Sequence, residues 1–316
     1  MVADLSGPEA MDGVNPVVRG ETFLSEPLCE YTSWRVGGPA DRLYLPAGQD
    51  DLLCFLRSLP PQEPLFWLGL GSNLLVRDGG IRGTVICTKN RLRGMRLVNG
   101  ERVYVEAGVP CALVARFGAE KSLNGAEFLA GIPGTFGGAL AMNAGAFGGE
   151  TWPLVERVWT TDRFGNVHER TATEYQIGYR SVTGPENEWF LAAELKLIPG
   201  DTGRSRERIK SLLAKRAATQ PVSQPSCGSV FRNPPGDHAA RLIESCGLKG
   251  HRMGGACVSE KHANFIVNLG DATALDIEAL INKVRDEVRQ QRGVSLEPEV
   301  RVVGEPAEQS LSERRK

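Results

Sequence analysis

Gly125–Ala139 reads GAEFLAGIPGTFGGA, with five glycines and one proline in fifteen residues. Glycines at this density let backbone amides approach a ligand that a Cβ atom would hold off. Aliphatic side chains interrupt the run, so it is not a flexible Gly/Ser linker. A second glycine loop, Gly69-Leu70-Gly71-Ser72-Asn73, lies upstream. Two loops of matching character favour a large ligand with a phosphate-bearing stretch, held from both sides.

Neither loop is a standard nucleotide signature. The Gly69–Asn73 loop lacks the third glycine of a Rossmann fingerprint and the acidic residue about twenty positions later. No Gly-Lys-Ser/Thr follows it, so it is not a P-loop either. The alternatives are a plain turn between strands for this loop and a glycine-rich packing seam for Gly125–Ala139.

Composition narrows the class of protein. The chain has 316 residues, with 37 basic against 38 acidic side chains. This balance argues against a nucleic-acid partner, and the length allows two or three domains. No apolar run reaches the roughly 18 residues that span a membrane, and Met1–Pro16 lacks the features of a secretory signal. We therefore expect no membrane insertion and a monomer.

The seven cysteines stand singly, without a CxxC pair. Most have apolar neighbours, which is typical of buried thiols in a reducing compartment, so a cytoplasmic location is expected. The four histidines lack ligand spacing, and we predict no metal site.

Hydrophobic periodicity predicts an α+β fold in three parts. Strands are expected at 65–68, 84–87, 102–107, 155–161, 190–198 and 264–268. Helices are expected at 50–57, 111–122, 206–217, 237–246 and 276–291, the first with an aspartate N-cap. The strand at 102–107 reads as half-buried, and 162–166 as a hairpin turn. The resulting domains are 21–90, 91–203 and 204–304, with mobile tails at 1–20 and 305–316.

Several polar segments lie outside the glycine loops. Tyr179-Arg180 stands in an expected loop, where an arginine can clamp a carboxylate. Ser229 follows a glycine and lies three positions before Arg232-Asn233, but no GxSxG elbow is present. Glu297 and Glu299 flank a proline and are expected to face the same side of a strand. Each feature alone has a plain alternative, as a solvated side chain, a turn or a cap.

Taken together and in order, these motifs resemble the UDP-N-acetylenolpyruvoylglucosamine reductase family, flavoenzymes of bacterial peptidoglycan precursor synthesis. The resemblance covers most of the chain, from Tyr31 to Gly304. Its motifs are Tyr31–Asp41, Gly69–Asn73, Gly131–Gly138, Met142–Gly145, Tyr179-Arg180, Gly228–Pro234 and Leu296–Glu299.

The resemblance implies three domains, two of which form an FAD-binding unit like that of the vanillyl-alcohol oxidase group. The third domain closes over the substrate. FAD and NADPH are the implied cofactors. The residues implied to hold FAD are Arg35, Gly69, Gly71, Ser72, Asn73, Gly131, Ile132, Pro133, Gly134, Thr135, Gly138, Asn143 and Gly145.

The implied reaction is the reduction of UDP-N-acetylglucosamine enolpyruvate to UDP-N-acetylmuramate. NADPH reduces the flavin, and N5 then delivers hydride to the terminal carbon of the enolpyruvyl group. Arg180 and Glu299 would stabilise the enolate-like charge, and Ser229 would protonate the adjacent carbon. The residues implied to bind the substrate are Tyr179, Arg232, Asn233, Lys261 and His262.

One departure and two rival functions accompany this interpretation. Some family members place a tyrosine over the substrate by an insertion after the Tyr-Arg motif. Here only Ser181–Trp189 precedes the next expected strand, so the chain resembles the shorter subtype. A flavin oxidase acting on a sugar or alcohol would not need the Ser229 and Glu299 pair. A non-catalytic flavin-binding scaffold is disfavoured by the intact set of Arg180, Ser229 and Glu299.

Overall fold

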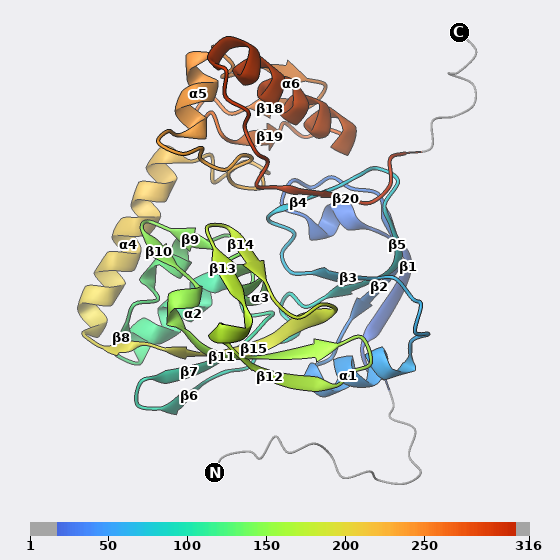
Figure 1. Cartoon of the computed structure of the whole chain (residues 1–316), viewed down its shortest axis with the longest axis vertical. Coiled ribbons are helices and arrows are strands. Elements are labelled where there is room, and N and C mark those ends of the chain that lie inside the picture. The colour runs from blue at the N-terminus through green and yellow to red at the C-terminus, as the bar shows by residue number, and fades with distance from the viewer. Residues whose placement is uncertain (1–17, 308–316) are drawn as a thin grey trace.

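A four-stranded sheet forms the first part of the fold (Figure 1), and the computed structural model describes residues 18–307. In spatial order its strands are β1 (Glu21–Pro27), β2 (Pro39–Leu45), β5 (Ile81–Cys87) and β3 (Leu65–Leu68). β2, β5 and β3 run parallel, while β1 joins β2 antiparallel. The carboxyl ends of the parallel strands therefore meet at one edge, and the Gly69–Asn73 loop follows β3 there.

Helix α1 (Gln49–Ser58) connects β2 to β3 and corrects one expectation. Its N-cap is Gly48 and not an aspartate. Asp51, one turn further on, is buried and accepts hydrogen bonds from Tyr44 Oη at 2.5 Å and from the Ala47 amide at 2.8 Å. The same carboxylate accepts from the amides of Arg19 and Gly20, so these two residues are anchored. The tail expected at 1–20 therefore ends before Arg19, and residues 1–17 lie outside the described part.

A five-stranded antiparallel sheet forms the second part. Its spatial order is β12 (Val167–Thr171), β11 (Val155–Asp162), β15 (Glu188–Lys196), β7 (Arg102–Glu106) and β6 (Met95–Asn99). Helices α2 (Cys111–Glu120) and α3 (Phe136–Ala141) belong to this part. The half-buried character predicted for the strand at 102–107 is wrong. Val103 and Val105 pack in the core that includes α2, and Tyr104 packs in the core that includes α1.

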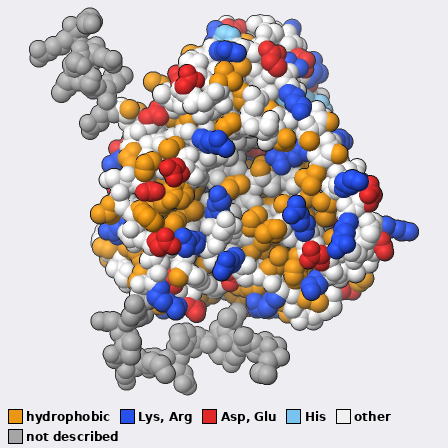
Figure 2. Space-filling view, turned by 180° about the vertical axis from the view of Figure 1, so that it is seen from behind, with side chains coloured by type: hydrophobic (Ala, Val, Ile, Leu, Met, Phe, Trp, Pro, Cys, Tyr) orange, Lys and Arg blue, Asp and Glu red, His pale blue; other side chains and the backbone are white. Residues whose placement is uncertain are grey.

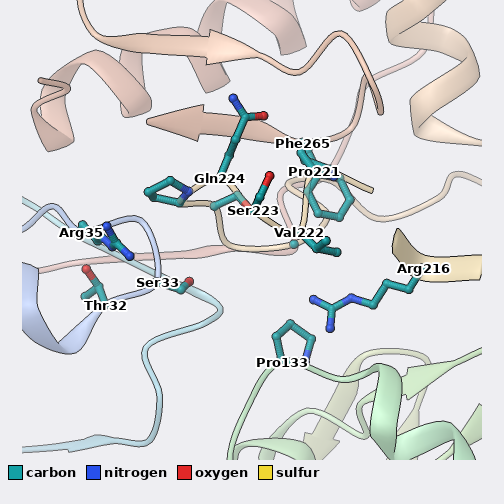
Figure 3. A pocket seen from close by; sticks show the side chains of 13 residues that line it. Thr32, Ser33, Arg35, Pro133, Arg216, Pro221, Val222, Ser223, Gln224 and Phe265 are labelled. Carbon is teal, nitrogen blue, oxygen red and sulfur yellow. The ribbon is translucent and has the colours of Figure 1, made fainter. Parts of the chain in front are cut away.

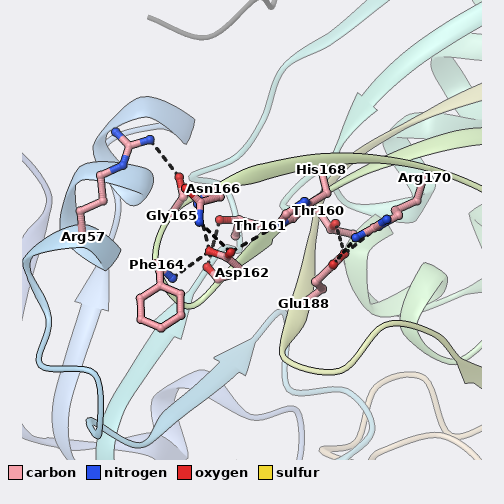
Figure 4. A network of polar contacts seen from close by, with 10 residues as sticks. All are labelled: Arg57, Thr160, Thr161, Asp162, Phe164, Gly165, Asn166, His168, Arg170 and Glu188. Atoms are coloured by element: carbon pink, nitrogen blue, oxygen red, sulfur yellow. Dashed lines mark hydrogen bonds and ion pairs between the residues drawn. The ribbon is translucent and has the colours of Figure 1, made fainter. Parts of the chain in front are cut away.

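The hairpin of β11 and β12 turns at Asp162–Asn166, as the sequence predicts. Figure 4 shows the Asp162 carboxylate accepting hydrogen bonds from the amides of Phe164 (2.8 Å) and Asn166 (3.0 Å). At the tip, Gly165 O accepts from Arg57 Nη2 of α1 at 2.9 Å. This contact ties the second sheet to the first part of the chain.

A smaller third part lies at the top of Figure 1. It contains the antiparallel strands β17 (Arg252–Met253), β18 (Ala256–Val258) and β19 (Ile266–Asn268), with helices α5 (Ala239–Ser245) and α6 (Ala274–Arg292). Ile277, Leu280, Ile281, Val284 and Val288 of α6 lie in its core, at the helical spacing read from the sequence. The long helix α4 (Thr202–Thr219) leads to this part, but Ile209 packs in the core of the second sheet.

The first and third parts share a core. Trp34 is fully buried there and donates from Nε1 to Ile266 O at 2.7 Å. Strand β20 (Arg301–Val303) pairs in parallel with β4 (Leu74–Val76). The backbone of Glu305 is also held by hydrogen bonds. Its carbonyl accepts from the Gly79 amide, and its amide donates to the Gly80 carbonyl. The C-terminal tail expected from 305 thus begins later, and residues 308–316 lie outside the described part.

The remaining elements are short. They are the strand pairs β8 (Leu123–Asn124) with β16 (Ile198–Pro199), β9 (Gly145–Ala146) with β10 (Gly149–Glu150), and β13 (Gln176–Gly178) with β14 (Ser181–Thr183). The 3-10 helices are η1 (Leu28–Tyr31), η2 (Glu127–Gly131), η3 (Trp152–Leu154) and η4 (Ala172–Glu174).

The visible surface carries no field of a single charge sign. Figure 2 shows basic and acidic side chains interspersed with apolar ones. Within residues 18–307, none of the helices is both long enough and apolar enough to cross a membrane.

Candidate active site

The first glycine loop presents unused backbone donors. Gly71 has a φ of +65°, and a side chain there would collide with the Tyr31 carbonyl. Among the described residues, no hydrogen-bond acceptor is found for the amides of Gly71, Ser72 and Asn73. Backbone N–H groups that leave water need a partner, so this loop is suited to an anionic ligand.

The second glycine loop faces the first. It runs from η2 through Ile132–Gly134 to Thr135, the N-cap of α3. A Cβ at Gly69 would overlap Thr135 Oγ1, and one at Gly134 would lie 3.2 Å from Ser72 Oγ. The amides of Gly134 and Thr135 also find no acceptor within the described chain. The two loops therefore form one cradle, with unpaired donors on both sides.

A partly buried ion pair lies beside this cradle. Arg180 Nε donates to Glu299 Oε1 at 3.1 Å, and the two side chains are 18% and 13% exposed. The sequence predicted an open loop at Arg180, and this is wrong. Arg180 lies in the two-residue turn of the β13–β14 hairpin, with a φ of +53°. Its Nη2 donates to Gly145 O at 2.6 Å. The turn aims the guanidinium inward because the hairpin strands fix both of its ends.

Burial dominates the electrostatics of Glu299. Loss of solvent raises the pKa of its carboxyl above the ordinary 4.5, although Arg180 and Arg232 oppose the rise. Glu297, expected on the same side, is exposed instead. The two glutamates diverge because the chain around Pro298 is not a regular strand. Glu299 can therefore hold or release a proton closer to neutral pH than a solvated glutamate can.

A backbone contact brings the segment of Ser229 to Glu299, although the two residues are far apart along the chain. The following residue, Val230, accepts a hydrogen bond from the Glu299 amide at 2.8 Å. Two residues earlier, Cys227 Sγ donates to Leu74 O at 3.2 Å, which anchors the segment beside the first glycine loop. No hydrogen bond of the Ser229 hydroxyl is found in residues 18–307, and the residue is half-buried. The hydroxyl is thus available to a ligand.

A cavity of about 300 Å³ opens between the second glycine loop, the end of α4 and the 221–228 segment (Figure 3). Arg35 and Pro133, both in the expected FAD set, line it together with Arg216. None of its lining residues is acidic, so the cavity favours an anionic ligand. No ion pair of Arg35 or Arg216 is found among the described residues. The sequence reasoning missed Arg216, because one arginine on an amphipathic helix carries no distinctive signal.

The five residues expected to bind substrate lie in different surroundings. Arg232 donates from Nη2 to Arg180 O at 3.2 Å, and its buried Nε has no partner in the described chain. Tyr179 is half exposed and packs against the Arg180 guanidinium. Asn233 is used as a cap, because its Oδ1 accepts from the Ala239 amide at 3.1 Å. Arg232 and Tyr179 thus border the ion pair.

Lys261 and His262 lie near the cavity but do not line it. Lys261 Nζ donates to Ala217 O at the end of α4 at 2.5 Å. His262 packs edge-on against Phe265, which lines the cavity, and burial lowers the pKa of its imidazole. Neither residue contacts Arg180 or Glu299 through any hydrogen bond found in residues 18–307.

Several residues of the expected FAD set support the site through packing. Gly131 lies against the Phe147 ring, and Gly145 lies beneath Arg180. Gly138 donates weakly to Thr135 Oγ1 at 3.5 Å. Asn143 is 1% exposed, and its side chain is fully engaged by the protein. Within the described residues, no group of acidic, histidine or cysteine side chains could hold a metal ion.

Comparison with known proteins decides between the alternatives. Residues 220–303 match the family described as the C-terminal domain of UDP-N-acetylenolpyruvoylglucosamine reductase, and residues 40–168 match an FAD binding domain. A UDP-N-acetylenolpyruvoylglucosamine reductase from Methylococcus capsulatus is 69% identical over 91% of this chain and 94% of its own length. The chain belongs to the UDP-N-acetylenolpyruvoylglucosamine reductase family.

Other members of the UDP-N-acetylenolpyruvoylglucosamine reductase family are also similar to this chain over most of its length. One from Alkalilimnicola ehrlichii is 62% identical over 90% of this chain and 96% of its own. The crystal structure of the Thermus caldophilus reductase has a TM-score of 0.76 and 36% identity, covering 90% of this chain and 98% of that one. The α+β fold with an FAD-binding unit is therefore confirmed. The chain is an FAD-dependent reductase of peptidoglycan synthesis.

Proposed function

We propose that this enzyme reduces UDP-N-acetylglucosamine enolpyruvate to UDP-N-acetylmuramate with NADPH. The observation that carries the proposal is the partly buried Arg180–Glu299 pair, set beside the cradle of unpaired amides. We infer a cytoplasmic location, since all seven cysteines are free thiols.

The residues of the cradle fit FAD. The amides of Gly71, Ser72 and Asn73 face those of Gly134 and Thr135, and such opposed donors suit a diphosphate. When bound, FAD takes hydride from NADPH and passes it to the substrate. The rest of the proposal concerns what the side chains of this chain do.

Arg180 and Glu299 would stabilise charge that develops on the enolpyruvyl carboxylate. Arg180 keeps Nη1 close to the Asn143 carbonyl at 3.4 Å, and its Nε already holds Glu299. A guanidinium fixed at both ends needs little rearrangement as the charge grows, which lowers the barrier. Glu299, with its raised pKa, would share a proton with that carboxylate.

Ser229 would supply the proton to the carbon next to the carboxylate. A hydroxyl is a weak acid, so it needs neighbouring groups that stabilise the alkoxide left behind or replace the donated proton. Glu299 is bonded through its amide to the residue after Ser229, which brings both side chains to the same region.

The two arginines that line the cavity, Arg35 and Arg216, would bind different nucleotide ligands. Arg35 adjoins the first glycine loop through Ser33, whose amide donates to Gly71 O at 3.2 Å, and we assign it to FAD. We assign Arg216, with Lys261 and His262 nearby, to the diphosphate of the substrate. Tyr179, exposed on the short hairpin, and Arg232 would border the enolpyruvyl end, while Asn233 would act through its cap on α5.

The test is an anaerobic pair of half-reactions. The purified protein should be yellow, and NADPH should bleach the flavin. Addition of UDP-N-acetylglucosamine enolpyruvate should restore the absorbance. A protein that is reoxidised by oxygen but not by this substrate would instead be an oxidase, and a colourless protein that FAD cannot reconstitute would refute the proposal.

A further inference from the structure

Two asparagines of the expected FAD set are bound to the catalytic pair instead. Asn143 follows the second glycine loop, and Asn73 ends the first. Each uses its side-chain amide to hold backbone next to Arg180 or Glu299. Asn143 spends both of its side-chain N–H donors on protein, and Asn73 spends one of its two.

Asn143 holds the hairpin that carries Arg180. Its Nδ2 donates to Gly178 O at 3.1 Å and to Glu150 Oε2 at 3.0 Å, while its Oδ1 accepts from the Trp152 amide at 3.1 Å. Both amide protons are therefore used. Its carbonyl oxygen also accepts from Arg180 Nη1. The residue has a φ of +46°, a conformation that asparagine tolerates better than most residues.

Asn73 holds Glu299 from the other side. Its Nδ2 donates to Glu299 O at 3.1 Å, and its own carbonyl accepts from the Arg301 amide at 3.0 Å. These two bonds flank Val300 and hold the backbone directly after Glu299. The backbone amide of Asn73 stays free to face the cradle.

We propose that Asn143 and Asn73 are positioning residues, which set Arg180 and Glu299 against each other and link each glycine loop to one member of the pair. The proposal rests on the function proposed above. Its physical basis is that a small misplacement of reacting groups costs much of the rate, even where binding is retained.

The experiment compares Asn143→Asp and Asn73→Asp with the wild-type holoenzyme. Each change keeps the shape and the acceptor oxygen but removes the N–H donors and adds a negative charge, which at position 143 lies beside Glu150. Aspartate also tolerates positive φ. Asn166→Asp is the matched control. Asn166 Nδ2 donates to Asp162 Oδ2 at 2.8 Å in the β11–β12 turn, and no hydrogen bond in the described residues joins Asn166 to Arg180 or Glu299.

Flavin content and reduction by NADPH should stay near wild-type values in both variants. Reoxidation by UDP-N-acetylglucosamine enolpyruvate should slow about tenfold to a hundredfold, mainly in kcat. Asn166→Asp should leave both half-reactions unchanged. If the variants instead lose flavin while each remaining flavin reacts at the normal rate, the asparagines are cofactor ligands and the proposal is wrong.

A second measurement does not depend on turnover. In a double-mutant cycle on the free energy of unfolding, Asn143→Asp and Arg180→Lys should be coupled, whereas Asn166→Asp and Arg180→Lys should be additive. Additivity in both cycles would overturn the role of Asn143. If the wild-type protein fails to use the substrate, the proposed function falls, and this cycle still decides whether Asn143 positions Arg180.

Discussion

At the scale of single residues, burial decides what the polar groups of the site can do. Glu299 and Glu297 are chemically identical and two positions apart, yet only Glu299 is enclosed and paired with Arg180. Ser229 is an ordinary serine whose place beside Glu299 follows from one backbone hydrogen bond. The chemical type of a side chain can be read from the sequence, whereas its burial cannot.

Replacement of Ser229, the proposed proton donor, should separate the two half-reactions. In Ser229→Ala, reduction of the flavin by NADPH should be normal, because no proton is donated to carbon in that step. Reoxidation by the enolpyruvyl substrate should slow about a hundredfold or more. Rapid-mixing absorbance measures both rates. Ser58→Ala in α1 is the control, and an equal loss of both half-reactions would contradict the assigned role.

Replacement of Glu299 should change how stability depends on pH. Since the folded-state pKa is raised, the folded protein takes up this proton before the unfolded chain does as the pH falls. Wild-type protein should therefore gain stability relative to Glu299→Gln between about pH 7 and the ordinary pKa of 4.5. Thermal unfolding across this range measures the difference. Glu297→Gln is the exposed control, and a difference that shrinks on acidification would contradict the raised pKa.

At the scale of elements, the two glycine loops work only as a facing pair. Both loops can be recognised in the sequence, because five glycines in fifteen residues are unusual. The sequence could not show that Gly69 touches Thr135, since their contact joins segments more than sixty residues apart. It also placed Arg180 in a loop, whereas the short strands β13 and β14 are too brief to recognise from alternation.

Gly69→Ala should separate the loops and weaken FAD binding. The added methyl would overlap Thr135 Oγ1, so the loops must move apart and the unpaired amides no longer converge. We expect the dissociation constant of FAD to rise at least about tenfold, or roughly 1.4 kcal/mol. Flavin content and fluorescence titration measure it. Gly100→Ala, where an added Cβ meets nothing within 4 Å, should retain its flavin.

At the scale of the whole molecule, the three parts are joined by shared cores. We propose three domains, at 21–90, 91–203 and 204–304. The packing of helix α4, however, favours assigning that helix to the second domain. Ile209 of that helix lies in the core of the second sheet, and the C-terminal family match begins at residue 220. Trp34 and Leu75 lie in the core of the third part, so that part and the first are expected to unfold together.

Substitution of Asp78 tests the contact between the first and third parts. Its carboxylate caps α6 from the first part of the chain, accepting from the amides of Ala274 at 2.9 Å and Leu275 at 3.0 Å. Asp78→Ala should lower the free energy of unfolding by about 1 kcal/mol, the usual worth of a helix cap. Urea unfolding measures it. Asp286→Ala on the exposed face of α6 should stay within about 0.5 kcal/mol of wild type, and equal effects would exclude the capping role.

The sequence by itself determined the chemistry that this protein carries. Residue types and their order along the chain predicted the glycine loops and the α+β class, and the resemblance of the motifs to a family implied the set of Arg180, Ser229 and Glu299, which stays a prediction. Only the tertiary structure decided that Asn143 and Asn73 bond to backbone beside Arg180 and Glu299, that Arg216 lines the cavity and that Glu297 does not join Glu299. Those outcomes depend on contacts between segments up to 226 residues apart, and no local pattern encodes such contacts.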